Sequence, residues 1–234
     1  MISGNCACWA VVPATGVGTR MGADRPKQYL SLGGKTVIEQ TLDTLLGYAE
    51  IDGVIVVLNN NDHFWSELNY QTSKPLLTCT GGEQRHHSVF NGLSTLKSHL
   101  ADDCMVLIHD AVRPFLPQQD LDRLLQAARA GDDGALLAVP VADTLKKTGD
   151  GQTVDSTQSR EGLWRALTPQ AFYLSKIYPA VASVLQSNGL VTDDSSAMEQ
   201  AGYHPRLVHA DHRNIKITHP EDLKLMASFL SQLP

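Results

Sequence analysis

The chain of 234 residues is 42% hydrophobic and 19% charged, values typical of a soluble globular protein with a substantial core. Its net charge of -6 at pH 7 argues against general nucleic-acid binding, which usually needs a basic face. The sequence contains neither an apolar run near the roughly 20 residues of a membrane span nor a recognisable signal peptide. The four cysteines lack paired or metal-binding spacing, so we expect a protein of the reducing cytoplasm. From the charge and the apolar runs, we expect neither nucleic-acid nor membrane partners.

Taken in chain order, strand and helix patterns alternate along most of the sequence. Apolar and β-branched runs predict strands at 9–12, 51–58, 76–80, 104–109, 134–141, 206–210 and 214–217. Helical spacing and capping signals predict helices from about 36 onward and at 63–69, 84–100, 118–130, 175–186, 192–202 and 218–230. This alternation predicts an α/β fold, a Rossmann-like three-layer sandwich with a mostly parallel, twisted sheet.

The alternation stops between residues 143 and 167. Thr and Val stretches surround a Gly-Asp-Gly turn there, a pattern typical of a β-hairpin. We therefore expect one domain over 1–234, from which the segment 143–167 projects as a β-hairpin arm. Because an arm with little core of its own must pack on something, a second subunit is a natural partner, and we expect a homodimer.

A small-residue loop follows the first predicted strand, which we expect to end at Pro13. The loop Ala14-Thr15-Gly16-Val17-Gly18 precedes two cations, Arg20 and Lys27. Glycines let backbone N–H groups approach an anion closely, and the cations add full charges, so the stretch predicts a triphosphate site. The loop matches neither G-x-x-x-x-G-K-[ST] nor G-x-G-x-x-G, which argues against a dinucleotide-dependent dehydrogenase.

Three later segments carry groups suited to a nucleotide site, and each also has a plain structural interpretation. The segment 81–88 is a Gly-Gly turn before a helix, with the Ser88 hydroxyl one turn in. His109-Asp110-Ala111-Val112-Arg113 places a carboxylate and a cation at a strand end, where they can bind ligand or simply pair. Lys216 in Asn214-Ile215-Lys216-Ile217-Thr218 is, taken alone, most easily interpreted as a surface lysine.

Together these segments form an ordered set of motifs over nearly the whole chain. The set comprises P-A-x-G-x-G-x-R-M, P-K-Q-Y, GG-x-x-R-x-x-SV, HDA-x-RP, L-W-x-x-L-T-P-Q, T-D-D and NIK-x-T. The first blocks resemble nucleotidyltransferases that join a nucleotide to a sugar or polyol phosphate. The full set resembles the 2-C-methyl-D-erythritol 4-phosphate cytidylyltransferases of the non-mevalonate isoprenoid pathway.

The resemblance implies a role for each matching position. Catalytic cations are implied at Arg20, Lys27 and Lys216. Nucleotide binding is implied for Ala14, Thr15, Gly16, Gly18, Gly82, Glu83, Ser88, Asp110 and Ala111. Binding of methylerythritol phosphate is implied for Arg113, Thr144, Arg160, Thr168 and Thr192, partly through an arm that crosses to a partner subunit. Asp110 is the implied neighbour of a Mg²⁺ ion, with Asp211 as a second candidate carboxylate because Arg213 stands where an acidic residue is expected.

The implied reaction is direct cytidylyl transfer from CTP to methylerythritol phosphate, with release of pyrophosphate. A phosphate monoester has a second pKa of about 6, so it is already largely dianionic and needs no strong general base. We therefore expect neither a Ser–His–Asp nor a Cys–His arrangement. Two alternatives stay open: a cytidylyltransferase for another polyol phosphate such as ribitol 5-phosphate, and a regulatory nucleotide-binding protein that kept the fold without turnover.

Overall fold

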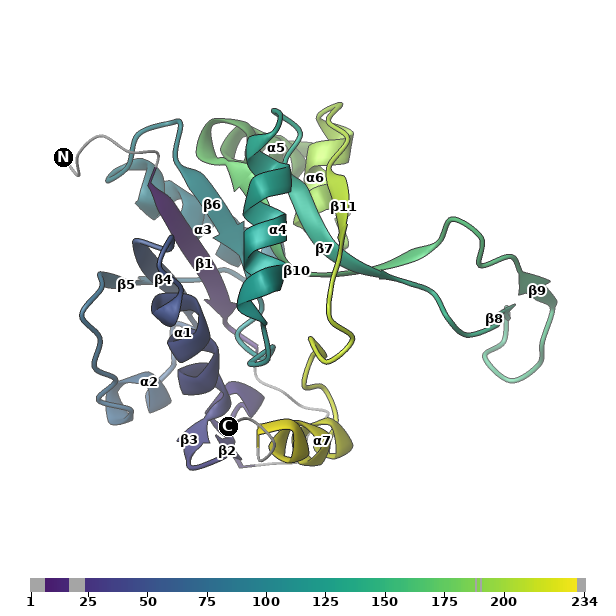
Figure 1. Cartoon of the computed structure of the whole chain (residues 1–234), viewed down its shortest axis with the longest axis horizontal. Coiled ribbons are helices and arrows are strands. Elements are labelled where there is room, and N and C mark those ends of the chain that lie inside the picture. The colour runs from purple at the N-terminus through teal and green to yellow at the C-terminus, as the bar shows by residue number, and fades with distance from the viewer. Residues whose placement is uncertain (1–6, 17–23, 188, 190, 231–234) are drawn as a thin grey trace.

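A seven-stranded sheet forms the centre of the protein, in a computed structural model that describes residues 7–16, 24–187, 189 and 191–230. The strand order is β11-β7-β10-β6-β1-β4-β5 (Figure 1). All neighbouring pairs are parallel except those of β10, which runs antiparallel to β6 and β7. The strands are β1 (Cys8–Ala14), β4 (Gly53–Leu58), β5 (Leu76–Thr80), β6 (Met105–Ile108), β7 (Ala135–Pro140), β10 (Trp164–Tyr173) and β11 (Arg206–His209).

Helices cover both faces of this sheet, so the predicted three-layer α/β architecture is confirmed. One face carries α1 (Val37–Gly47) and α4 (Gln118–Arg129), and the other carries α3 (Arg85–Lys97), α5 (Leu174–Ser187) and α6 (Asp194–Gln200) (Figure 1). Outside the arm, the remaining elements are the 3₁₀ helix η2 (Lys27–Tyr29), the short helix α2 (Phe64–Glu67), the last helix α7 (Pro220–Leu230) and the small ribbon of β2 (Ser31–Leu32) and β3 (Lys35–Thr36).

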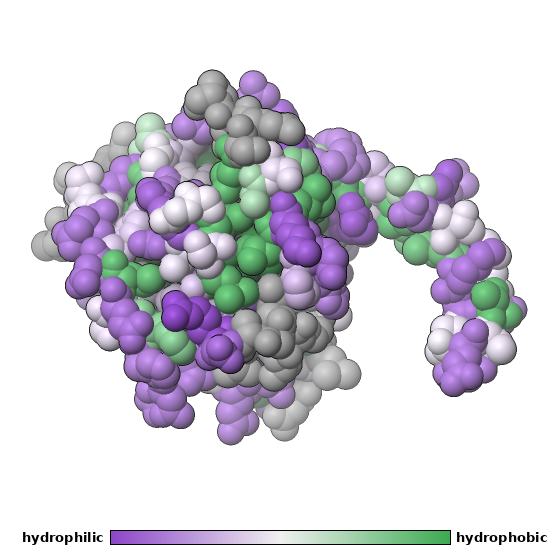
Figure 2. All heavy atoms as spheres, turned by 90° about the horizontal axis from the view of Figure 1, so that it is seen from below, coloured by the Kyte–Doolittle hydropathy of each residue, from purple (hydrophilic) through white to green (hydrophobic). Residues whose placement is uncertain are grey.

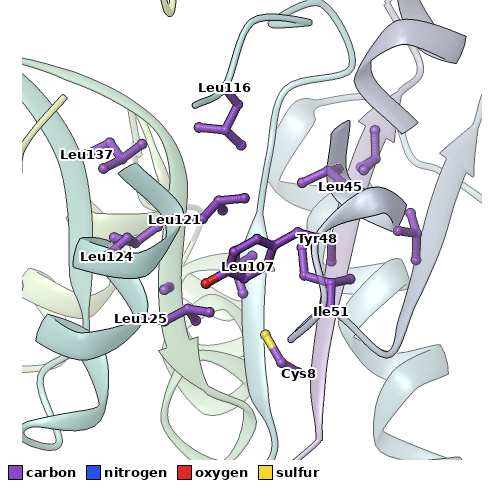
Figure 3. Close-up of a cluster of buried hydrophobic side chains, with 14 of the residues drawn as sticks. Cys8, Leu45, Tyr48, Ile51, Leu107, Leu116, Leu121, Leu124, Leu125 and Leu137 are labelled. Atoms are coloured by element: carbon purple, nitrogen blue, oxygen red, sulfur yellow. The ribbon is translucent and has the colours of Figure 1, made fainter. Parts of the chain in front are cut away.

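The alternation of side chains along β1 produces the two buried layers. Ala10 and Val12 belong to the cluster under α1 and α4, whereas Trp9 and Val11 belong to the cluster under α3 and α5. Figure 3 shows part of the first cluster, in which Leu107 of β6 lies among leucines of α1 and α4. Burial on both faces explains why the parallel strands appear in the sequence as continuous apolar runs.

The first strand does not end at Pro13, as the sequence predicts, but continues to Ala14. Pro13 aligns with Val57 of β4, while β6 aligns with β1 only as far as Val11. Because alternate residues of a strand direct their backbone groups to the same neighbour, Pro13 faces the side where β6 has ended. Its missing N–H therefore removes no bond of the β1–β6 ladder.

The arm is shorter than predicted. Residues 164–167 belong to β10, which pairs with β7 and β6 inside the main sheet, so the arm comprises 143–163. Pro169 conceals this strand in the sequence, but it lies where the β10 register shifts between Ala166 and Gln170. Beyond the sheet the arm carries only the short hairpin of β8 (Leu145–Lys147) and β9 (Ser156–Gln158) and stands clear of the body (Figures 1 and 2).

The segment 214–217 is a loop rather than the predicted strand. The backbone N–H of Ile217 donates to the carbonyl of Val112, so the loop is tied to the chain that follows β6. The following helix begins at Pro220, and the Asp222 carboxylate in its first turn accepts the backbone N–H groups of Thr218 and His219. Among the described residues, no helix has the length and apolarity needed to cross a membrane.

Candidate active site

A cleft of about 350 Å³ lies beyond the carboxyl ends of β1 and β6, the edge of a parallel sheet where ligands usually bind. Its walls come from the loop after β1, the segment before α3, the segment after β6 and the loop before α7. Predicted site residues that line it are Ala14, Thr15, Gly16, Lys27, Glu83, Asp110, Ala111 and Lys216. Segments more than 200 residues apart in the sequence thus meet in one cleft.

The two predicted nucleotide loops are bonded to each other. The hydroxyl of Thr15 lies 3.2 Å from that of fully buried Ser88, whose oxygen also accepts the N–H of Gly82 at 3.2 Å. A Cβ on Gly81 would lie 2.3 Å from the Thr15 methyl group and 2.7 Å from the Ser88 hydroxyl. Glycine is therefore required at 81 by close packing, and Ser88 acts by holding the loops rather than by lining the cleft.

Sequence reasoning missed a second support of the β1 loop. Gln28 is 3% exposed, lines the cleft and donates from Nε2 to the carbonyl of Ala14 at 2.7 Å. Its neighbour Lys27 donates from Nζ to the carbonyl of Ile217 at 3.1 Å. The P-K-Q pattern is visible in the sequence, but a buried glutamine has no sequence signature of its own, so only Lys27 was predicted as a site residue.

Asp110 is the electrostatic centre of the cleft. One carboxylate oxygen lies 3.0 Å from Nζ of Lys216 and 3.2 Å from Nε of Arg113, and the other lies 3.5 Å from Nε of Arg85. Burial alone would raise the pKa of Asp110, but the charges of Arg85, Lys216 and Arg113 outweigh it and hold this pKa well below its usual value. The carboxylate is therefore ionised, and the Asp–Arg pair that the sequence left as an alternative is present.

A buried network fixes the end of β6. Thr168 accepts the backbone N–H of Asp110 at 3.1 Å, and its hydroxyl lies 3.1 Å from Nδ1 of His109. The other ring nitrogen of His109 lies 3.0 Å from the carbonyl of Arg113. Because burial lowers the pKa of His109 to about 4, the ring is neutral, donates to Arg113 and accepts from Thr168. Thr168 thus orients Asp110 from behind the cleft.

The remaining predicted acceptor residues lie away from the described part of the cleft. Arg113 is 8% exposed and donates to the carbonyl of Asn214, so it supports the Lys216 loop from behind. Thr192 borders a separate depression beside α6. Thr144 and Arg160 are exposed on the arm. Gly18 and Arg20 fall outside the described residues.

The described residues offer no cluster of three or more potential metal ligands. Asp211 is bonded to Arg213 and lines another depression with Asp120, so it does not join Asp110. The cleft itself supplies the carboxylates of Asp110 and Glu83. Mg²⁺ is commonly held by one or two carboxylates together with substrate phosphates, and this donor set fits an ion that arrives with a triphosphate.

Fold and cleft define the class: an α/β nucleotidyltransferase, in which glycine-containing loops and cationic side chains meet at the carboxyl edge of the sheet. Residues 8–232 match the family model described as IspD, 2-C-methyl-D-erythritol 4-phosphate cytidylyltransferase. The chain is 46% identical to the enzyme of that name from Tolumonas auensis, covering 95% of this chain and 96% of the relative. It is 47% identical to that of Pseudomonas entomophila, covering 93% of each.

Solved structures agree with the sequence comparison. A crystal structure of 4-diphosphocytidyl-2C-methyl-D-erythritol synthase matches with a TM-score of 0.85 and 34% identity, covering 97% of this chain and 100% of the other. The Francisella tularensis 2-C-methyl-D-erythritol 4-phosphate cytidylyltransferase matches with a TM-score of 0.81 and 32% identity, covering 94% and 97%. The chain therefore belongs to the 2-C-methyl-D-erythritol 4-phosphate cytidylyltransferase family. Its activity is cytidylyl transfer from CTP to methylerythritol phosphate in isoprenoid biosynthesis.

Proposed function

We propose that this cleft binds CTP and aligns its α-phosphorus with the phosphate of 2-C-methyl-D-erythritol 4-phosphate. The observation that supports this most strongly is the meeting of Lys27, Lys216 and Asp110 at the strand ends, beside loops suited to a base. A phosphate oxygen of the acceptor attacks the α-phosphorus, a new P–O bond forms, and the bond to the bridging oxygen breaks. Pyrophosphate leaves with that oxygen and its electron pair.

In this mechanism the side chains align and neutralise charge. Lys27 and Lys216, together with Arg20, stabilise the negative charge that gathers around the α-phosphorus in the transition state. Gly82 and Glu83, with Ala14 and Thr15, contact the nucleoside. The acceptor phosphate is mostly dianionic near neutral pH, since its second pKa is about 6. The reaction therefore needs no side chain to remove a proton.

A divalent cation is the proposed cofactor. Mg²⁺ bound to the triphosphate would supply charge neutralisation at the phosphate oxygens, with Asp110 as its nearest protein ligand. The Oδ1 atom of Asp110 suits this contact, because its cation neighbour Arg85 is 3.5 Å away whereas Oδ2 contacts both Lys216 and Arg113.

We also propose a homodimer in which the arm crosses to a second copy and brings Thr144 and Arg160 to that copy's site. The exposure of every residue from 146 to 163 supports this arrangement, because such a segment gains its packing only from a partner. Leu163 and Trp164 at its base are 43% and 38% exposed. The cysteine pattern of the sequence supports a cytoplasmic location.

Pyrophosphate release tests these assignments directly. The reaction is run with CTP and either methylerythritol 4-phosphate or ribitol 5-phosphate, with Mg²⁺ and with chelator. We expect release only with methylerythritol 4-phosphate and only with the cation. Full turnover in chelator would contradict the cofactor proposal, and sedimentation of the protein as a monomer at assay concentration would contradict the shared site.

A further inference from the structure

Arg85 connects three parts of the site that the reaction must keep in register. It is the first residue of α3 and follows the nucleotide loop 81–84. Its Nη1 and Nη2 donate to the two carboxylate oxygens of Asp194 at 3.0 and 2.7 Å. Its Nε lies 3.5 Å from Oδ1 of Asp110. One planar group therefore joins the nucleotide loop, the end of β6 and the start of α6.

The start of α6 depends on this connection for its position. Asp194 is 3% exposed, so its charge has lost most of its water, and the guanidinium of Arg85 compensates for it. The neighbouring turn is held by Gln170, which donates to Asp193 at 2.8 Å and accepts the N–H of Ser195 at 2.7 Å. Gln170 anchors the turn to β10, whereas Arg85 anchors it to the nucleotide side.

Thr192 lies immediately before this turn and shares a small depression with Arg85 and Asp194. We propose that Arg85 is a positioning residue that holds the Thr192 segment and Asp110 at a fixed separation from the nucleotide loop. This set of contacts from Arg85 to Asp194 and Asp110, which we call the clamp, thereby aligns the acceptor with bound CTP. This inference rests on the proposed assignment of Thr192 to the acceptor.

The contact between Arg85 and Asp110 also affects Lys216. Asp110 attracts Lys216, Arg113 and Arg85 at once. Because Arg85 and Arg113 already compensate for the carboxylate, Lys216 loses less when it leaves Asp110 for a substrate phosphate. The Lys216 side chain is 40% exposed, so it has room to make that move. Without the contact from Nε of Arg85, Asp110 holds Lys216 more tightly and turnover falls.

Two variants separate the two ends of the clamp. Asp194→Asn weakens only the α6 end, so we expect the KM for methylerythritol phosphate to rise about 10-fold while the KM for CTP changes less than about twofold. Arg85→Lys keeps the charge, but a single ammonium cannot contact Asp194 and Asp110 at once, so we expect the same rise together with a fall in kcat of about 10-fold. The double variant should lose no more than Arg85→Lys alone, because both changes break one interaction.

Arg123→Lys is the matched control. Arg123 pairs with buried Asp120 at the start of α4, outside the cleft, so this change should leave both KM values and kcat unaltered. Melting temperatures of all variants, measured without substrate, report the structural part of each change. The clamp is refuted if the KM values for both substrates rise equally, in step with the loss of melting temperature. It is also refuted if the KM for methylerythritol phosphate and kcat stay unchanged in Asp194→Asn and Arg85→Lys. Should Arg85→Lys fail to fold, Asp194→Asn alone decides.

Thr192→Ala separates the clamp from the proposed role of Thr192 in binding the acceptor. An unchanged acceptor KM in Thr192→Ala would remove Thr192 from the acceptor site while Asp194→Asn still tests the clamp. A raised acceptor KM in Thr192→Ala with normal kinetics in both Asp194→Asn and Arg85→Lys would keep the assignment and overturn the clamp.

Discussion

The cleft and the arm differ in how their residues are packed: the cleft is surrounded by buried, paired side chains, whereas the arm is exposed to solvent. Around the cleft, charged groups such as Asp110 and Asp194 are buried and paired, and loops distant in sequence are bonded to one another. In the arm, every residue from 146 to 163 is exposed, and β8 and β9 contribute three residues each. Figure 2 shows the arm extending from the body with hydrophilic and hydrophobic residues mixed along it.

This difference shows which part of the molecule a single chain can hold in place by its own packing. The cleft keeps its geometry because the sheet and helices on both faces fix each strand end, so preorganised charge is available before substrate binds. The arm has no layer to pack against in a single chain, which is why we propose that it packs on a second copy. Substitutions in the body and in the arm test this division, and the largest free-energy cost is expected for a buried leucine of the sheet.

Leu107→Ala should destabilise the body severely. Leu107 is fully buried in β6, two residues before His109, and lies among the leucines of Figure 3. Truncating such a leucine typically costs about 2–5 kcal/mol of unfolding free energy through lost burial and a residual cavity. Denaturant unfolding followed by circular dichroism measures this loss. A cost below about 0.5 kcal/mol would mean that the sheet does not hold the site.

Lys27→Ala should abolish most turnover without unfolding the protein. Loss of one transition-state contact of this kind typically costs on the order of 10²–10³ in kcat, and Arg20→Ala should behave alike. Lys35→Ala is a suitable control, because Lys35 pairs with Asp43 at the surface. Pyrophosphate release and melting curves on the same preparations provide the measurement. Near-normal kcat in Lys27→Ala would remove this cation from the reaction.

Arg160→Ala should affect one substrate and not the other. If the arm completes the acceptor site of a second copy, the KM for methylerythritol phosphate should rise about 10-fold to 100-fold, since a charge-assisted contact is worth roughly 1.5–3 kcal/mol. The KM for CTP should stay the same because the nucleotide loops lie in the body. Lys147→Ala, another exposed cation of the arm, is the control. An unchanged acceptor KM would separate the arm from catalysis.

Local patterns in the sequence predicted the elements well where backbone chemistry is local. The helix that starts at about residue 36, which has a capping box at Thr36, the span of β5 and the alternation of strands and helices are all present. Prediction failed where tertiary pairing decides: β10 passes through Pro169 because the register shifts there, and β1 passes Pro13 because β6 has already ended. The residues alone show neither the register shift of β10 against β7 nor the point at which β6 ends beside β1.

The same distinction holds for the site. Groups that carry charge or form a glycine motif, such as Lys27, Gly82 and Asp110, were predicted from the sequence together with the family resemblance, and Lys27 and Asp110 line the cleft. Supporting residues were missed, because Gln28 and Arg85 act through contacts with segments distant in the chain. A buried carbonyl that needs a donor, or a buried carboxylate that needs a cation, becomes apparent only after folding.

Val154→Ser should have the smallest effect on a single chain and is the most direct test of the division. Val154 is 63% exposed in the arm, so its removal should change the unfolding free energy of the monomer by less than about 0.5 kcal/mol. If a partner covers it, the variant should instead raise the dimer dissociation constant, measured by sedimentation over a dilution series. The matched change Val56→Ser, in buried β4, should destabilise the fold itself. A Val154→Ser variant with an unaltered dissociation constant would leave this part of the arm outside the interface, because an apolar side chain that stays in water contributes nothing to association.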